Sequence, residues 1–126
     1  MTEERVKVLL EEAYSRICSG ALFEKARKKY EKLKIYPSRF SAPGDYADAA
    51  ALLEKLKDFP ADVLEEEADR LVYLAGAGTN SMNPIIVEIL VRDGNVEISA
   101  WAKEGLIKQR AAWRAQDAFA EALELK

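Results

Sequence analysis

The residues best placed to do chemistry form a dense acidic group. Glu65, Glu66, Glu67 and Asp69 fall within one short segment. If the segment 62–75 is a helix, Glu65 and Asp69 lie one turn apart on the same face, where two carboxylates can help to hold Mg²⁺. A second acidic run upstream, which would complete such a site, is missing, and acidic side chains near a helix N-terminus are favourable without any metal. A solvated acidic face is therefore the simpler interpretation, and a carboxylate–metal (Mg) hydrolase stays as one alternative function.

The sequence of 126 residues contains no histidine and a single cysteine, Cys18. Serine–histidine–aspartate catalysis, cysteine–histidine catalysis and histidine-containing metal sites all need an imidazole. Cys18 follows Ile17 of a predicted apolar helix face, which favours a buried thiol over a reactive one. The sequence thus predicts a protein that is not an enzyme and has no catalytic residue, no cofactor and no metal.

Glycine, hydroxyl and amide residues are concentrated in the segment 76–84. The backbone N–H groups of such a loop can cradle a phosphate or a carboxylate. A dinucleotide fingerprint or a P-loop, however, joins a strand to a following helix, and here the predicted helix comes first and the strand second. A plain connector is the simpler interpretation, and contact of this loop with a ligand or partner stays open.

Basic residues are concentrated between positions 25 and 39, and acidic residues between 45 and 69. The net charge of −3 argues against a general nucleic-acid binder. Three interpretations stay open: a solvated helix face paired with the acidic segment, a surface for an acidic protein partner, and a nucleic-acid-binding module on residues 25–39 in which Tyr30 or Tyr36 stacks on bases. The partner-binding residues predicted in this stretch are Lys25, Lys28, Lys29, Lys32 and Arg39.

Apolar residues that recur every three to four positions predict helices over most of the chain. Thr2 is a suitable N-cap for the first helix. Tyr36-Pro37 is expected to end the second helix, because the residue before a proline avoids the helical region, and an extended connection follows. Asp45 is expected to cap the third helix. The predicted helices cover residues 2–19, 21–34, 45–58 and 60–75, with a C-terminal helix from 103 or 106 to 125.

The C-terminal helix is rich in alanine. A stripe of small residues allows another element to approach closely, so this stripe is expected to face the rest of the protein. Trp113, Phe119 and Leu123 are expected beside it. The predicted stripe consists of Ile107, Ala111, Ala115, Ala118, Ala122 and Leu125.

One β-hairpin is predicted near the middle of the second half of the chain. Its strands are residues 85–92 and 95–102, and Asp93-Gly94 is a strong signal for a two-residue turn. This turn pairs Val91 with Val96 and places the strongly apolar partners on one face. A three-residue turn would instead place a glutamate on that face.

The second face of the hairpin also carries apolar residues, namely Ile86 and Trp101, which lie opposite each other, and Leu90 beyond them. An isolated hairpin has two open edges, which proteins usually cover or pair. These three residues are therefore predicted to contact either the rest of the monomer or a second copy, in which case two hairpins join into a four-stranded sheet of a homodimer.

The sequence as a whole predicts an α+β fold that is mainly helical, with four to five helices packed on the hairpin in a single domain over residues 1–126. No apolar run approaches the roughly 20 residues of a membrane-spanning helix, and the lone cysteine fits a reducing compartment, so a cytoplasmic protein is expected. The function favoured is a small non-enzymatic protein-interaction domain: a regulator, an inhibitor or immunity-type binder, or an accessory subunit.

Overall fold

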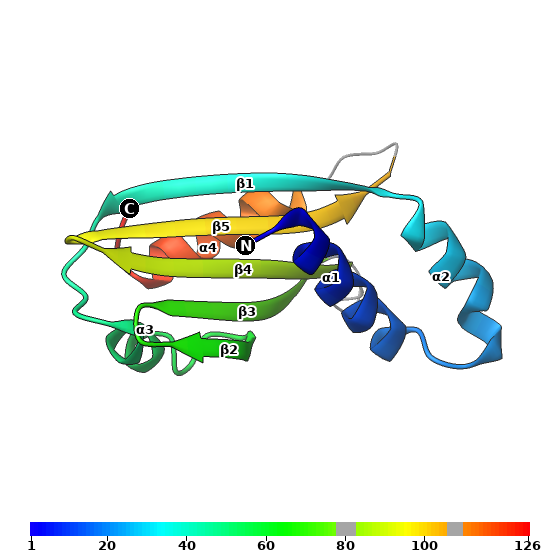
Figure 1. Cartoon of the computed structure of the whole chain (residues 1–126), viewed down its shortest axis with the longest axis horizontal. Coiled ribbons are helices and arrows are strands. Elements are labelled where there is room, and N and C mark those ends of the chain that lie inside the picture. Colours follow the sequence, from blue (N-terminus) through cyan, green and yellow to red (C-terminus); the bar gives the residue numbers. More distant parts are fainter. Residues whose placement is uncertain (78–82, 106–109) are drawn as a thin grey trace.

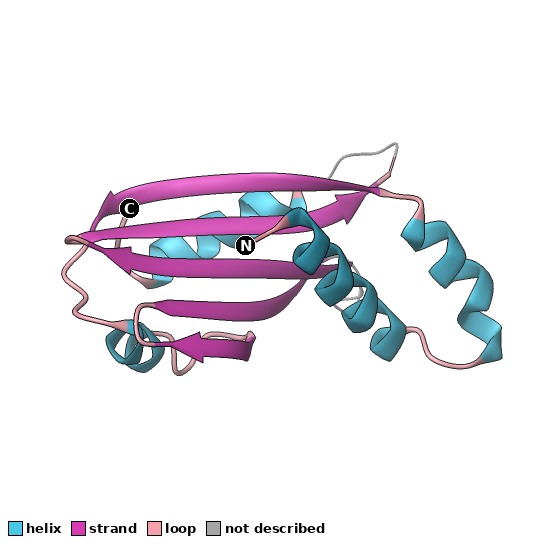
Figure 2. Ribbon diagram, viewed as in Figure 1, coloured by secondary structure: helices cyan, strands magenta, loops and turns pink. Residues whose placement is uncertain are grey.

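The structure is a computed structural model that describes residues 1–77, 83–105 and 110–126. In the described part, five antiparallel strands form one sheet in the order β1-β5-β4-β3-β2, with helices on both faces (Figures 1 and 2). The strands are β1 (Lys34–Pro43), β2 (Asp62–Glu67), β3 (Arg70–Ala77), β4 (Asn83–Arg92) and β5 (Asn95–Glu104). The helices are α1 (Glu3–Ile17), α2 (Glu24–Glu31), α3 (Ala49–Lys55) and α4 (Ala111–Ala122), with a short 3₁₀ turn η1 (Ala21–Phe23) before α2.

The predicted hairpin is confirmed as β4 and β5. The two strands pair Val91 with Val96, Ile89 with Ile98 and Val87 with Ala100, as the two-residue turn requires. Both turn residues have a positive φ, 48° at Asp93 and 77° at Gly94. Because mirror-image turns of this kind follow the natural twist of the strands, the sequence Asp-Gly fixes the register of the central pair of the sheet.

We expect Gly94→Val to lower the free energy of unfolding by about 1–3 kcal/mol, because a β-branched residue is strained at this φ. Gly94→Asn is the matched control, since asparagine tolerates the left-handed region and keeps most of the stability. Chemical denaturation of the two variants measures the difference. Equal stability of the valine and asparagine variants would show that the turn is not of this type.

The prediction of a mainly helical chain with one hairpin is wrong. The segment predicted as a fourth helix over 60–75 forms β2 and the start of β3, which pair with each other as a second hairpin. Leu71, Val72 and Tyr73 are consecutive and all buried, because one face of β3 contacts α3 and α4 and the other contacts α1. A short continuous apolar run of this kind suits a buried strand as well as a helix.

The segment predicted as an extended connection after Tyr36-Pro37 is also a strand, β1, at the edge of the sheet. The second helix is correspondingly short and ends at Glu31 instead of Lys34. The third helix begins later than predicted, because Asp48 and not Asp45 is its N-cap, accepting a hydrogen bond from the backbone N–H of Ala51 at 3.0 Å. The predicted cap of α1 is confirmed, since the Thr2 hydroxyl accepts from the N–H of Arg5 at 3.2 Å.

The C-terminal helix starts at Ala111, and Lys103 and Glu104 belong to β5. The predicted small-residue stripe is confirmed in part, since Ala111 is buried and Ala115, Ala122 and Leu125 pack at the margin of the core. The centre of the buried side is formed by Phe119 with Ala112 and Ala120, and Ala118 of the stripe is exposed. Ile107 of the predicted stripe and residues 78–82 of the glycine-rich loop lie outside the described residues.

Two apolar clusters form on the two faces of the sheet. The larger lies between the sheet, α3 and α4, and the smaller between the sheet and α1. Figure 1 shows that α1 covers only the half of its face that lies away from the β4–β5 turn. The helices of the described residues therefore leave uncovered the other half of this face and the outer side of α2, which projects beyond the end of the sheet (Figure 2).

Candidate interaction surfaces

The lysines predicted to bind a partner lie on α2 and directly after it. Lys25, Lys28, Lys29 and Lys32 are all exposed. Lys28 lies 3.4 Å from the Glu24 carboxylate, but both side chains are largely in solvent, where such a pair contributes little. Within the described residues the other three lysines make no ion pair. We call these four lysines the α2 lysine surface.

The orientation of α2 is fixed from beneath by Tyr30, its one buried residue. The Tyr30 ring stacks on the Tyr14 ring of α1 with centroids 4.0 Å apart and planes inclined by 10°. The buried ammonium of Lys103 lies 4.9 Å from the Tyr30 ring centroid and donates to the backbone oxygens of Tyr30 and Glu31. Because Tyr30 faces inwards, the lysines on the opposite side of the helix face solvent.

The start of α2 is held by a second contact. The Arg27 guanidinium donates to the backbone oxygens of Cys18 at 2.6 Å and Gly20 at 3.0 Å. Arg27 is thus a structural member of the basic stretch and is not part of the lysine surface. Cys18 is 1% exposed, which confirms the prediction of a buried thiol.

The Tyr30 hydroxyl is buried and has no hydrogen-bond partner in the described part of the chain. Burial, followed by the nearby Tyr14 and Glu11, raises the pKa of Tyr30 above its ordinary value near 10. The folded protein therefore holds this proton at a pH where the unfolded chain has lost it. Stability contributed by the neutral hydroxyl is present below about pH 10 and is lost as the pH rises further.

We expect Tyr30→Phe to be as stable as the wild type at pH 7 or up to about 1 kcal/mol more stable, because it removes an unsatisfied buried hydroxyl. The same variant should lose less stability between pH 9 and pH 11 than the wild type. Thermal denaturation across this pH range measures both effects. A loss of more than about 1 kcal/mol at pH 7 would mean that the hydroxyl has a partner.

The remaining predicted contact residues all lie on the half-covered sheet face. Ile86 and Trp101 pair across β4 and β5 as predicted, but both are buried beside α1. Leu90 is half-buried nearer the turn, and Arg39 of β1 is exposed with its guanidinium 5.8 Å from the Trp101 ring. The face that the sequence assigned to a partner is therefore shared between α1 and solvent.

The homodimer prediction depends on open edges of the hairpin, but both edges pair with other strands of the same chain. β5 pairs along its length with β1, and β4 pairs with β3. The outer edge of β1 is then protected by prolines. The N–H of Gly44 points towards the hairpin and donates to the Gly94 oxygen at 3.0 Å. Because the N–H groups of successive residues in a strand point to opposite sides, the nitrogens of Pro37 and Pro43, an odd number of residues before Gly44, point outwards. Prolines at these positions remove donors that a second strand would need.

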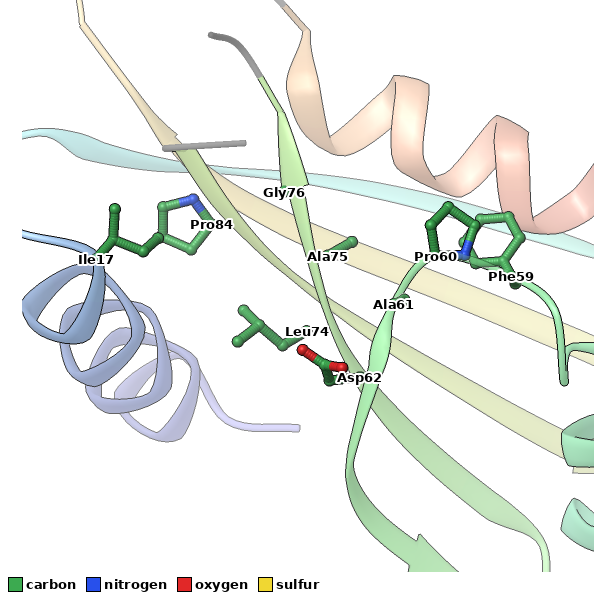
Figure 3. Close-up of a pocket in the computed structure, with 9 residues that line it drawn as sticks. All are labelled: Ile17, Phe59, Pro60, Ala61, Asp62, Leu74, Ala75, Gly76 and Pro84. Atoms are coloured by element: carbon green, nitrogen blue, oxygen red, sulfur yellow. The ribbon is translucent and has the colours of Figure 1, made fainter. Parts of the chain in front are cut away.

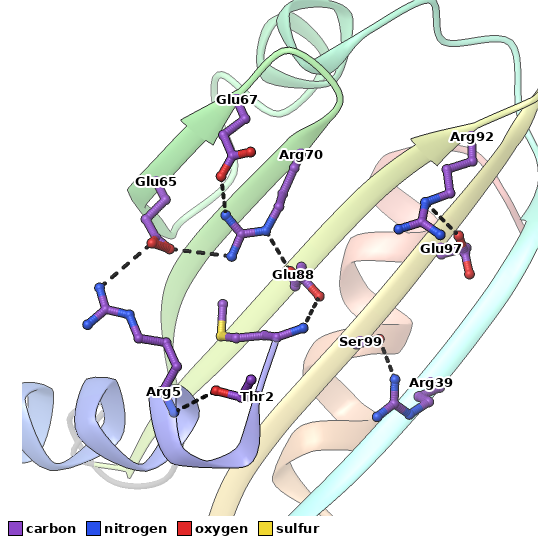
Figure 4. A network of polar contacts seen from close by, with 11 residues as sticks. Thr2, Arg5, Arg39, Glu65, Glu67, Arg70, Glu88, Arg92, Glu97 and Ser99 are labelled. Atoms are coloured by element: carbon purple, nitrogen blue, oxygen red, sulfur yellow. Dashed lines mark hydrogen bonds and ion pairs between the residues drawn. The ribbon is translucent and has the colours of Figure 1, made fainter.

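A network of charged groups lies on the sheet face beside the start of α1 (Figure 4). Arg70 of β3 is at its centre and contacts the carboxylates of Glu88 at 2.6 Å, Glu67 at 2.9 Å and Glu65 at 3.4 Å. Glu65 also lies 3.7 Å from Arg5 of α1. Burial alone would lower the pKa of Arg70, but its hydrogen bond to Glu88 and the three negative charges raise the pKa overall.

This network accounts for the acidic group that the sequence analysis considered for a metal. The helix over 62–75 does not exist, and Glu65 and Asp69 do not share a helical face. Glu65 and Glu67 are instead neutralised by arginine. Among the residues that the structure describes, no group of three acidic or cysteine side chains is arranged to hold a metal ion.

A cavity of about 460 Å³ opens at the end of the sheet opposite the β4–β5 turn. Figure 3 shows its walls, which come from the end of α1, the segment before β2, β2 itself, the end of β3 and the start of β4. The sequence analysis left open a ligand contact for the segment 76–84, whose end residues Gly76 and Pro84 line this cavity, but its other walls come from segments far apart in the chain. It is lined by Ile17, Phe59, Pro60, Ala61, Asp62, Leu74, Ala75, Gly76 and Pro84.

Comparison of the chain with known protein families, with curated proteins and with solved structures gives no match. Of the helices in the described ranges, none combines the length and the apolar composition that crossing a membrane requires.

Proposed function

We propose that the chain is a small non-enzymatic interaction domain that binds an acidic surface of a partner protein through the α2 lysine surface. The observation that supports this most directly is the position of α2. The helix projects beyond the sheet (Figure 1), its inner side is anchored by the Tyr30–Tyr14 stack, and its outer side carries the four exposed lysines. A regulator, an inhibitor or an accessory subunit would use such a surface in the cytoplasm, where the single buried thiol of Cys18 stays reduced.

Electrostatics would act here mainly on the rate and the specificity of association. Exposed lysines contribute little to stability, but a cluster of them speeds the encounter with a negative surface and disfavours positive ones. Binding should therefore weaken as salt rises, because charges separated by more than about 8 Å are screened at physiological ionic strength.

A protein partner is favoured over nucleic acid by the aromatic residues of the same stretch. Single-stranded nucleic acids are usually held by aromatic side chains on which bases stack. Tyr30 is 4% exposed and already stacked on Tyr14, and Tyr36 is half-buried within β1. Neither tyrosine of the basic stretch thus offers an open ring for base stacking, and the one aromatic side chain exposed next to these lysines in the described residues is Phe23, directly before α2.

The proposal is tested by capture experiments with three forms of the protein. In the first variant Lys25, Lys29 and Lys32 are changed to glutamate. The control variant changes Lys55, Lys57 and Arg114, which are exposed on α3, just after it and on α4. Each reversal changes the net charge by two, so both variants go from −3 to −9. The control variant also breaks the exposed ion pairs of Lys55 with Glu124 and of Lys57 with Glu54, which contribute little to stability.

We expect one protein to be captured by the wild type and the control variant, to be lost with the α2 variant, and to be retained after nuclease treatment. Capture that ends on nuclease treatment would replace the proposal with nucleic-acid binding. Equal capture by both variants would show that binding does not use the α2 lysine surface.

A further inference from the structure

The cavity at the end of the sheet has an uncovered strand edge as part of its wall. The pairing of β2 with β3 begins at Asp62 opposite Leu74, so β3 continues past its partner. Over Ala75–Ala77, β4 is the one strand of the described residues that pairs with β3. Because successive residues of a strand direct their N–H and C=O groups to opposite sides, at least one residue of these three has both groups on the uncovered edge.

The lining of the cavity carries one charged side chain, Asp62. Its lining side chains are apolar except for Asp62, whose carboxylate lies among them beside Leu74 in Figure 3. Asp62 makes no ion pair or side-chain hydrogen bond with any described residue, whereas Glu65 of the same strand contacts both Arg5 and Arg70. The cavity thus combines an unneutralised negative charge, a backbone edge and apolar walls.

From this combination we propose that the cavity binds a small organic cation, a primary amine carrying a short apolar body. The ammonium group lies against the Asp62 carboxylate, where a charge-assisted hydrogen bond forms. The remaining ammonium protons reach the uncovered backbone oxygen of β3. The apolar body packs between Ile17 and Pro84 on one side and Phe59 and Pro60 on the other (Figure 3).

The size and the chemistry of the cavity both fit this class of ligand. About 460 Å³ lies within the usual range for small-molecule sites, which are mostly apolar with few polar groups. A carboxylate analogue of the ligand would place two negative charges together, and a neutral alcohol would lose the charge-assisted contact. The site should therefore select by charge among molecules of equal length. This proposal does not depend on the partner proposed for α2.

The test compares hexylamine, 1-hexanol and hexanoate as ligands of the whole chain at pH 7 and low salt, by titration calorimetry and by amide chemical shifts. We expect saturable binding of hexylamine, with shifts at Ala75 and Gly76, and at least about tenfold weaker binding of the alcohol. Asp62→Asn should weaken hexylamine binding by about tenfold and leave 1-hexanol binding unchanged. Asp58→Asn removes an exposed carboxylate that does not line the cavity and should have no effect.

Three results would overturn the proposal: no saturable binding of hexylamine, equal binding of hexylamine and 1-hexanol, or Asp62→Asn binding hexylamine as tightly as the wild type does. Because Asp62 is exposed, Asp62→Asn should keep the fold, which the unshifted amide resonances of the remaining sheet verify.

Discussion

Arg70→Met lowers the free energy of unfolding by about 3 kcal/mol, because it leaves the buried Glu88 carboxylate without its main partner. Glu88 is 5% exposed, and its remaining contact is the terminal ammonium of Met1 at 3.3 Å. Removing one member of a buried ion pair is costly since the other charge stays in a poorly solvated place. Urea denaturation gives the size of the loss.

Arg92→Met is the matched control for this prediction. Arg92 lies on the neighbouring strand, and its guanidinium is 3.8 Å from Glu97 with both side chains in solvent, so its loss should cost less than about 1 kcal/mol. Adding Glu88→Gln to Arg70→Met should recover part of the stability, because a neutral amide replaces the unpaired charge. If Arg70→Met were no more harmful than Arg92→Met, the charged network would be an ordinary solvated surface.

Phe119→Ala lowers the free energy of unfolding by about 3–5 kcal/mol, the usual range for deleting a buried phenylalanine. Phe119 is fully buried, and its ring centroid lies 4.2 Å from that of Phe59 and 5.2 Å from that of Tyr73. The side chain thus joins α4, β3 and the segment after α3. Thermal or urea denaturation measures the loss.

Trp113→Ala on the same helix is the control, since this side chain is 41% exposed and its removal leaves no buried cavity. It should cost less than half as much as Phe119→Ala. A larger loss from Trp113→Ala than from Phe119→Ala would mean that α4 does not pack through the side that carries Phe119.

The parts of the fold that could be predicted from the sequence are those fixed by local chemistry. Asp93-Gly94 needs positive φ at both positions, and this alone sets the register of β4 and β5. Thr2 could be recognised as a cap because the residues after it follow a clear helical period. Neither feature depends on which other segment lies nearby.

The remaining elements depend on packing between distant segments, which the sequence pattern does not contain. The apolar run at Leu71–Leu74 is compatible with a helix or a strand, and only its pairing with β2 and β4 shows that it is a strand. In β1, Pro37 predicts the end of regular structure, yet a proline suits an edge strand, because the outer side of such a strand needs no N–H donor. In α4 the buried side combines Phe119 with Ala112 and Ala120, because burying the Phe119 ring removes more apolar surface from water than burying any one alanine of the predicted stripe.

The candidate surfaces also divide into features that local sequence predicts and features that depend on packing between distant segments. That Lys25, Lys28, Lys29 and Lys32 are exposed could be predicted, since charged side chains on a short amphipathic helix rarely become buried. That Ile86 and Trp101 are covered by α1 could not, because the helix is more than 65 residues away in the sequence.

The most direct measurement of the central claim is zero-length carbodiimide cross-linking of the complex with the captured partner, followed by mass spectrometry. This reagent joins a lysine amine to a carboxylate only when the two groups are in contact. We predict amide bonds from Lys25, Lys28, Lys29 or Lys32 of this chain to aspartate or glutamate of the partner. Cross-links only from Lys55, Lys57 or Lys126, or only from this chain's carboxylates to lysines of the partner, would contradict binding through α2.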